Sequence, residues 1–208
     1  MLRKATGFTL LACSALFGFS LASGAYAADV AKLVENCANC HGKDGASTES
    51  DVPIIGGFSE PYLSDTLKAY KQKERSCPET KIRTGEKKGT ITDMCKVAKD
   101  LGDGDVKEVA KYFAGKKFAR ATQKFDPALA KKGKEIHEND CEKCHSEAGS
   151  VASDDAGILA GQWMPYLDDQ FKDFASGKRT APKKMQSMLK KLDKAGFEAL
   201  VNYYGSLK

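Results

Sequence analysis

Residues 37–41 read CANCH, and residues 141–145 read CEKCH. Both are copies of C-x-x-C-H, the attachment pattern for c-type haem. Two thiols three positions apart on one helical turn can bond the two vinyl groups of one haem, and the adjacent histidine then points its imidazole at the iron. A zinc site needs four ligands, whereas each motif supplies three. The pattern therefore predicts two covalently bound haem c groups, attached at Cys37, Cys40, Cys141 and Cys144.

The two motifs belong to an internal repeat. Cys37 and Cys141 are 104 positions apart, and many residues that follow align at the same offset. Further along the offset falls to 91, which pairs Met94 with Met185, so the first copy carries 13 extra residues between Arg75 and Met94. A duplicated module explains both offsets. The expected units are domain 1 at residues 28–118, a polar linker at residues 119–126 and domain 2 at residues 127–208.

Each copy has the pattern of a helical domain. Apolar residues recur at helical spacing through residues 30–37, and again in a final helix near residues 106–113 and 197–204. Pro61 and Pro165 suit the first turn of another helix. No segment shows a convincing strand alternation. The prediction is an all-α protein with two tandem domains, each wrapped around one haem, which supplies the apolar centre that such small domains lack.

Residues 1–27 have the pattern of a cleaved secretory signal peptide. Arg3 and Lys4 precede an apolar stretch, and Ala25-Tyr26-Ala27 forms a small-residue cleavage site. A lipoprotein-type cleavage at Cys13 is the alternative. Cleavage after Ala27 leaves 181 residues with a net charge of +3 and no segment apolar enough to span a membrane. We therefore expect a periplasmic protein without a membrane span, and a charge this weak does not favour nucleic acid as a partner.

Histidine is too scarce to supply both axial ligands of two haems. The chain has three histidines, of which His41 and His145 are the expected proximal ligands. His137 lies four residues before Cys141, and we interpret it as a surface or haem-edge residue, with ligation to iron as the alternative.

Methionine is the natural sixth ligand. Met94 is the only methionine of domain 1, and the repeat places Met185 opposite it in domain 2. Met188 and Met164 are the alternatives in domain 2. A thioether opposite an imidazole closes both faces of the haem and favours ferrous iron, which suits electron transfer better than substrate binding.

Two cysteines remain outside the motifs. Cys77 lies in the 13-residue insertion, and Cys95 follows Met94. In an exported chain a disulfide between them is the default expectation. The alternative makes Cys95 a haem ligand or a redox-active thiol.

These residues resemble two known groups of proteins. Two class I cytochrome c modules in tandem, each with C-x-x-C-H early and a methionine before the last helix, look like the cytochrome c4 family over the whole mature chain. In domain 2, the stretches FDPALAKKGKEIHENDCEKCH and ILAGQWMPYL are similar to the two-haem cytochrome subunit of flavocytochrome c sulfide dehydrogenase. The resemblance implies the axial pairs His41/Met94 and His145/Met185.

The resemblance also has departures. Class I modules place a proline carbonyl against the proximal histidine. Pro53 fits this role in domain 1, but the matching residue in domain 2 is Gly157. The insertion with Cys77 and Cys95 is not part of the subunit's pattern.

The resemblance to the sulfide dehydrogenase subunit implies an electron-transfer protein that is not an enzyme on its own. It would accept electrons from a flavoprotein that carries FAD and oxidises sulfide, and pass them to a small cytochrome or an oxidase. The first alternative is a free-standing cytochrome c4-type carrier to a terminal oxidase. The second is a two-haem enzyme such as a thiosulfate dehydrogenase or a peroxidase, which needs an open iron or a cysteine ligand.

Overall fold

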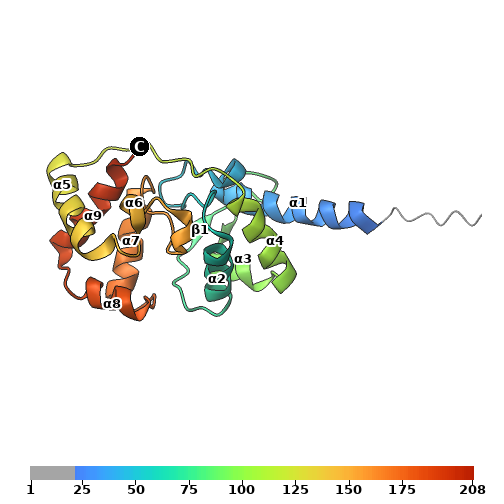
Figure 1. The fold of residues 1–208 in the computed structure, drawn as a ribbon. Helices are drawn as coiled ribbons and strands as arrows, with labels where there is room; N and C mark the ends of the chain where they lie inside the picture. The colour runs from blue at the N-terminus through green and yellow to red at the C-terminus, as the bar shows by residue number, and fades with distance from the viewer. Residues whose placement is uncertain (1–21) are drawn as a thin grey trace, which may run out of the picture.

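The computed structural model describes residues 22–208, so residues 1–21 of the expected signal peptide lie outside the described residues (Figure 1). The described chain is helical, as predicted, with the two halves of the sequence folded as two domains beside each other (Figure 1). From residue 22 onward, no helix has both the length and the apolar character needed to cross a bilayer.

Domain 1 begins with a long helix that carries the first C-x-x-C-H motif at its C-terminal end. Its elements are α1 (Ala22–His41), η1 (Lys43–Gly45), α2 (Glu60–Lys71), β1 (Thr80–Lys81), β2 (Ile91–Thr92), α3 (Met94–Lys99) and α4 (Asp103–Ala114).

Domain 2 has no strands and has additional short helical turns between its first and second long helices. Its elements are α5 (Pro127–Ile136), the π-helix η2 (His137–Cys141), α6 (Ser146–Gly149), η3 (Ala152–Asp154), α7 (Met164–Ala175), α8 (Lys183–Leu189) and α9 (Lys194–Ser206). A connection without helix or strand runs from the end of α4 to Asp126, whose carboxylate caps α5 by accepting the Ala128 and Leu129 N–H groups at 2.7 and 3.1 Å.

The second helix of each domain starts as the sequence predicts. Pro61 lies in the first turn of α2, and Pro165 lies in the first turn of α7. Ser59 caps α2 through its hydroxyl, which accepts the Tyr62 N–H at 3.2 Å. Backbone N–H groups in the first turn of a helix have no acceptor within the helix, so a proline there loses no helical hydrogen bond.

Each domain has a core formed where its second helix packs against its last helix, and Ile158 of domain 2 also joins the core of domain 1. In domain 1 Leu63 of α2 contacts the cluster that contains Val109 and Phe113 of α4. In domain 2 the equivalent cluster contains Leu167 and Phe171 of α7 with Leu200 and Tyr204 of α9. The crossing of α5 and α9 requires Gly133, because a Cβ there would lie 2.1 Å from the Ala199 carbonyl oxygen.

The duplication is confirmed by hydrogen bonds that occur twice. The Ile55 N–H donates to the Gly45 carbonyl at 2.9 Å, and the Leu159 N–H donates to the Gly149 carbonyl at 2.8 Å. These residues are related by the offset of 104 found in the sequence.

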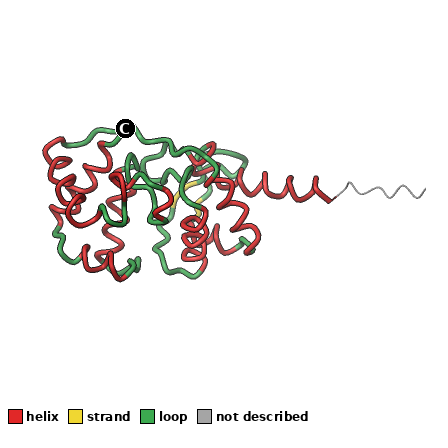
Figure 2. The backbone as a smooth tube through the Cα atoms, in the orientation of Figure 1, coloured by secondary structure: helices red, strands yellow, loops and turns green. Residues whose placement is uncertain are grey.

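The expectation that no strand would form is wrong at one place. β1 and β2 pair antiparallel, with Thr80 opposite Thr92 and Lys81 opposite Ile91, and are the two yellow segments of Figure 2. Each strand has two residues, which is too short for an alternating pattern to be visible in the sequence. The strands lie in the insertion, and we call residues 76–93 the hairpin segment.

Buried hydrogen bonds join the two domains. The Gln162 side chain is fully buried, accepts the Ile54 N–H at 3.0 Å and donates to the Ile54 carbonyl at 2.9 Å. Beside it the Trp163 indole N–H donates to the Ser47 carbonyl at 3.0 Å. Because these groups are paired only when the domains touch, separating the domains would leave them without these partners.

Candidate haem sites

In domain 1 the predicted ligand and attachment residues line one cavity. Cys37, Cys40 and His41 come from the end of α1, and Met94 is the first residue of α3. Most of the remaining lining is apolar or aromatic: Pro53, Ile55, Phe58, Tyr62, Leu63, Leu67, Tyr70, Val97, Leu101, Val109, Ala110, Phe113 and Tyr166. An apolar cavity with a few polar groups is the surrounding that a porphyrin ring requires.

The proximal histidine of domain 1 is held in one tautomer. His41 is buried, and its Nδ1 lies 2.9 Å from the Pro53 carbonyl oxygen. Since a carbonyl only accepts, Nδ1 carries the proton and Nε2 keeps its lone pair. Burial lowers the pKa of His41, which keeps the imidazole neutral. The expected role of Pro53 is thereby confirmed.

The motif cysteines lie in apolar surroundings. Burial raises the pKa of Cys37 to about 11, with the neighbouring Cys40 as a smaller cause. Burial likewise raises the pKa of Cys141 to about 11, followed by the charge of Asp140. Both thiols are therefore neutral near pH 7, as suits groups placed against the rim of an apolar ring.

Domain 2 differs from domain 1 around its proximal histidine. The Nδ1 atom of His145 is buried and has no hydrogen-bond partner in the described part of the chain. At the position that matches Pro53 the backbone differs, because Gly157 has φ +78°, which a proline cannot adopt.

Two methionines of α8 are available to the domain 2 haem. Met185 and Met188 are both half-buried. Met164 is used elsewhere, because its Sδ lies 2.5 Å from the place that a Cβ on Gly205 would occupy. The repeat, which pairs Met185 with Met94, therefore remains the basis for choosing Met185.

His137 is not a surface residue, so the surface interpretation is wrong, and a position at the haem edge stays a prediction. Its side chain is fully buried, with Nδ1 2.9 Å from the Tyr204 hydroxyl and Nε2 against the Glu142 carboxylate. Glu142 also accepts the Glu147 N–H at 2.9 Å, so the His137, Tyr204 and Glu142 side chains join η2, α9 and α6. The sequence contained a signal for this burial: the repeat aligns His137 with the apolar Leu33.

Arg75 is a buried cation without a counter-charge among the described residues. Only 7% of its surface is exposed, its Nε has no partner, and no described carboxylate forms an ion pair with it. An unpaired buried charge is costly. Since Arg75 lines the domain 1 cavity, the carboxylates of haem propionates would supply the missing charge. The residues present therefore fit a haem.

The arginine contacts run in both directions between the domains. Arg75 donates to the Tyr166 hydroxyl at 3.3 Å and to Gln170 at 2.6 Å. Its repeat partner Arg179 donates to Gln170 at 2.8 Å and lies 3.5 Å from the Tyr62 hydroxyl. Tyr62 and Tyr166 are themselves repeat partners, so each half presents the same pair of residues to the other.

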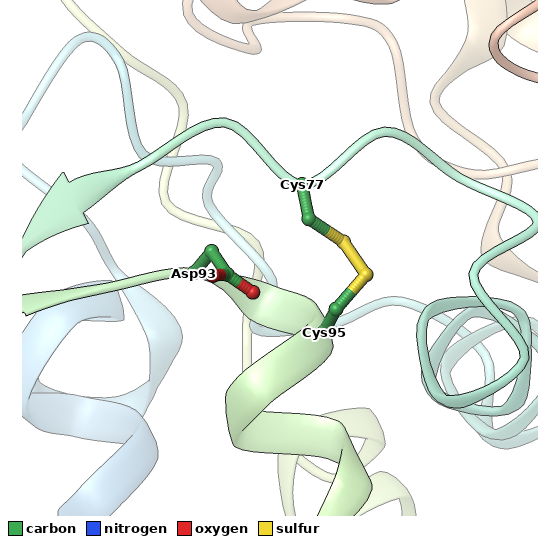
Figure 3. A group of neighbouring side chains, drawn as sticks. All are labelled: Cys77, Asp93 and Cys95. Atoms are coloured by element: carbon green, nitrogen blue, oxygen red, sulfur yellow. A yellow bond between two sulfur atoms is a disulfide. The ribbon is translucent and has the colours of Figure 1, made fainter.

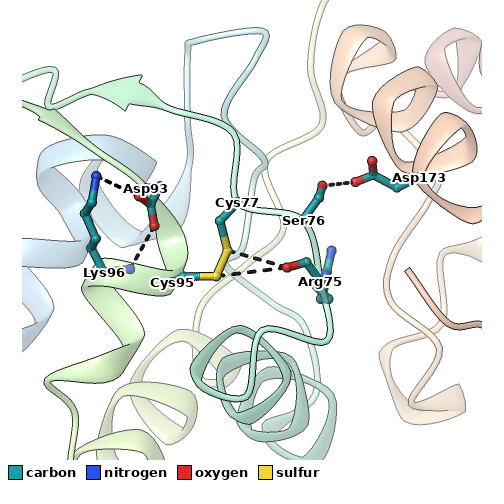
Figure 4. Close-up of a disulfide and its surroundings, with 7 residues drawn as sticks. All are labelled: Arg75, Ser76, Cys77, Asp93, Cys95, Lys96 and Asp173. Atoms are coloured by element: carbon teal, nitrogen blue, oxygen red, sulfur yellow. Dashed lines mark hydrogen bonds and ion pairs between the residues drawn. A yellow bond between two sulfur atoms is a disulfide. The ribbon is translucent and has the colours of Figure 1, made fainter. Parts of the chain in front are cut away.

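Cys77 and Cys95 form a disulfide in the structure, 18 residues apart in the chain (Figure 3). Asp93 lies beside the two sulfurs, but the sulfurs are bonded to each other and are not free thiolates for a metal. Asp93 instead caps α3 by accepting the Lys96 N–H at 2.8 Å, and it pairs with the Lys96 Nζ at 3.0 Å (Figure 4). The disulfide therefore holds the hairpin segment to the start of α3, next to Met94.

Comparisons with known proteins agree with this arrangement. Residues 27–115 match the family model "Cytochrome c", and residues 128–203 match the model "Cytochrome C oxidase, cbb3-type, subunit III". The chain is 30% identical to cytochrome c4 of Pseudomonas aeruginosa, over 96% of both chains. It is 32% identical to cytochrome c4 of Stutzerimonas stutzeri, over 96% of this chain and 97% of that one.

The fold gives the same result. The crystal structure of reduced recombinant cytochrome c4 from Pseudomonas stutzeri superposes with a TM-score of 0.68 at 28% identity, covering 88% of this chain and 98% of that one. Because the similarity extends over nearly the full length of both chains, it involves both domains. The chain therefore belongs to the cytochrome c4 family and is a two-haem electron-transfer protein, with one covalently bound haem c in each domain.

Proposed function

We propose that this chain is a free-standing periplasmic electron carrier of the cytochrome c4 type, which delivers electrons to a terminal oxidase. Thioether bonds form at the four motif cysteines, and the axial pairs are His41 with Met94 and His145 with Met185. The observation that carries this proposal is the match with carriers named cytochrome c4 over 96–97% of their own length.

The domain 1 cavity supports a carrier in preference to a catalyst at the iron. His41 and Met94 line the same cavity, so a haem bound there would take both as ligands to its iron and would have no position left for a substrate. A two-haem enzyme with a cysteine ligand would need the Cys95 thiol, but Cys95 is bonded to Cys77. When bound, a haem c supplies one-electron chemistry at its iron.

The chain's own residues orient the group and exclude water. The Pro53 carbonyl holds the His41 ring by its Nδ1 proton, which fixes the direction of Nε2. The buried aromatic and aliphatic lining keeps water from the cavity, and Arg75 offers charge to carboxylates at the domain interface.

Mass spectrometry of the denatured protein tests the attachment residues. We expect two haem additions in the wild-type chain, because thioether bonds survive unfolding. Replacing Cys141 and Cys144 by alanine should leave one addition, and the matched Cys37→Ala, Cys40→Ala variant should also leave one. Two additions in either variant would contradict the assignment.

A second candidate is supported by the resemblance of the second half to the cytochrome subunit of a sulfide dehydrogenase. The stretch FDPALAKKGKEIHENDCEKCH includes His137, which is buried, and Glu142, whose carboxylate contacts the His137 ring. In this alternative the donor is a flavoprotein with FAD, whose two electrons from sulfide are divided between two haems.

Reduction kinetics with defined donors separate the two candidates. For the carrier, both haems should be reduced by a membrane fraction that oxidises quinol, and sulfide with an FAD-containing sulfide-oxidising flavoprotein should leave them oxidised. Rapid reduction of both haems by the sulfide and flavoprotein mixture, with none by the quinol-oxidising fraction, would establish the second candidate instead. The chain alone with sulfide is the control.

A further inference from the structure

The hairpin segment covers the end of the first C-x-x-C-H motif. The N–H groups of Arg83 and Thr84 both donate to the Asn39 carbonyl at 3.0 Å. The Thr84 hydroxyl lies 3.1 Å from the Asn39 Oδ1. Asn39 immediately precedes Cys40, and both are half-buried.

The contact is close and anchored on several sides. Gly85 has φ +76°, and a Cβ there would lie 2.6 Å from the Asn39 Oδ1. The Arg83 guanidinium pairs with Asp51, across the motif from the hairpin strands. The disulfide fixes one end of the segment to α3, and Ser76 bonds to Asp173 of domain 2 (Figure 4).

Domain 2 has no counterpart of this cover. Lys143 and Cys144 align with Asn39 and Cys40, and both are exposed. The connection from α7 to α8 takes only residues 176–182 and contains no strand. Within residues 22–208, no side chain forms a hydrogen bond or ion pair with the Lys143 ammonium.

The open end of the second motif carries unpaired positive charge. The Lys191 Nζ lies 2.6 Å from Asp140, which places the end of α8 beside η2 and its Cys141. Four further lysines, in the motif, in α8 and directly after α8, are exposed, and none has a described carboxylate within 4.0 Å: Lys143, Lys183, Lys184 and Lys190. Such a surface attracts negative charge and raises the rate of association with it.

We infer that the external redox partner is a protein with an acidic surface, which docks over Cys144 and the α8 lysines and exchanges electrons with the domain 2 haem. The hairpin segment closes the matching approach to the domain 1 haem, which exchanges its electron through domain 2. Each step moves one electron, oxidising one ferrous haem as the acceptor is reduced. Domain 1 is then an internal one-electron store. The existence of an external partner rests on the proposed carrier function. The cover over Cys40 does not depend on that function.

Solvent access to the two haems tests the cover directly. A neutral, soluble gadolinium chelate should broaden the NMR signals of haem methyl groups several-fold more for domain 2 than for domain 1. Gly85→Ala should remove this difference by pushing the hairpin segment away from Asn39. Gly89→Ala is the matched control, because Gly89 has φ +85° in the same hairpin but nothing within 4 Å of its added Cβ. Equal broadening of both haems in the wild-type protein would overturn the inference, whether or not the variants fold.

Charge reversal tests the docking surface with a probe that needs no physiological partner. Hexacyanoferrate(III) is an anion that takes one electron from a ferrous haem and becomes hexacyanoferrate(II). Lys143→Glu with Lys190→Glu should slow oxidation of the reduced protein on the order of tenfold at low ionic strength, and salt should abolish the difference. Lys87→Glu with Lys88→Glu, at the exposed tip of the hairpin segment, is the matched control and should have little effect. A slower rate only in this control pair would place exchange at domain 1 instead.

Discussion

Replacing Met94 by alanine is expected to abolish the methionine–iron charge-transfer band of one haem, and replacing Met185 by alanine should abolish that of the other. A thioether favours ferrous iron, so its loss lowers the potential of the affected haem. Axial ligands set haem potentials over roughly 0.8 V, and a fall on the order of 0.1 V is expected for each substitution. Ferric absorption spectra and a spectroelectrochemical titration measure both effects.

Met188→Ala and Met164→Ala are the controls for this result. Met188 shares α8 with Met185, and Met164 packs against Gly205. Both variants should keep two methionine bands. If Met188→Ala removes a band and Met185→Ala does not, the register that the repeat assigns to domain 2 is incorrect.

The double variant Cys77→Ala, Cys95→Ala is expected to lose about 3 kcal/mol from the free energy of unfolding of domain 1, because a disulfide over a loop of this length restricts the unfolded chain. The effect should be selective, since the disulfide ties the hairpin segment to α3. The methionine band of the domain 1 haem should therefore disappear at a lower urea concentration, while that of domain 2 keeps its midpoint.

Alkylation of the denatured, unreduced wild-type protein provides the control for that variant. It should label neither Cys77 nor Cys95. Labelling of either cysteine would show that the two residues are free thiols in solution, and an unchanged urea midpoint in the double variant would contradict the stabilising role of the disulfide.

The sequence predicts well those features that depend on local pattern or on the repeat. The helical domains and the first-turn prolines follow from spacing along the chain, and the Pro53 carbonyl on His41 follows from the resemblance to class I modules. The double occurrence of the motif also predicts the two haems, which the family comparison supports.

Features that depend on distant contacts could not be predicted in the same way. Arg75 meets Tyr166 across 91 positions, and no pattern within either domain indicates that contact. The cover over Cys40 comes from strands of two residues each, too short to leave an alternating signature. The burial of His137 was not predicted, because a histidine is polar and is expected near the surface, whereas its repeat partner Leu33 is apolar.

The reciprocal contacts of Arg75 and Arg179 have the form of a two-fold homodimer, in which residue i meets residue j and j meets i. In a dimer of identical chains every substitution appears in both subunits, so a change that suits one subunit's role is also present in the other subunit. Joining the halves into one polypeptide removes that restriction while keeping the shared contact surface. The hairpin segment occurs in one half only, and the His137 network occurs in the other half only. A homodimer of identical chains could not have acquired these two changes separately.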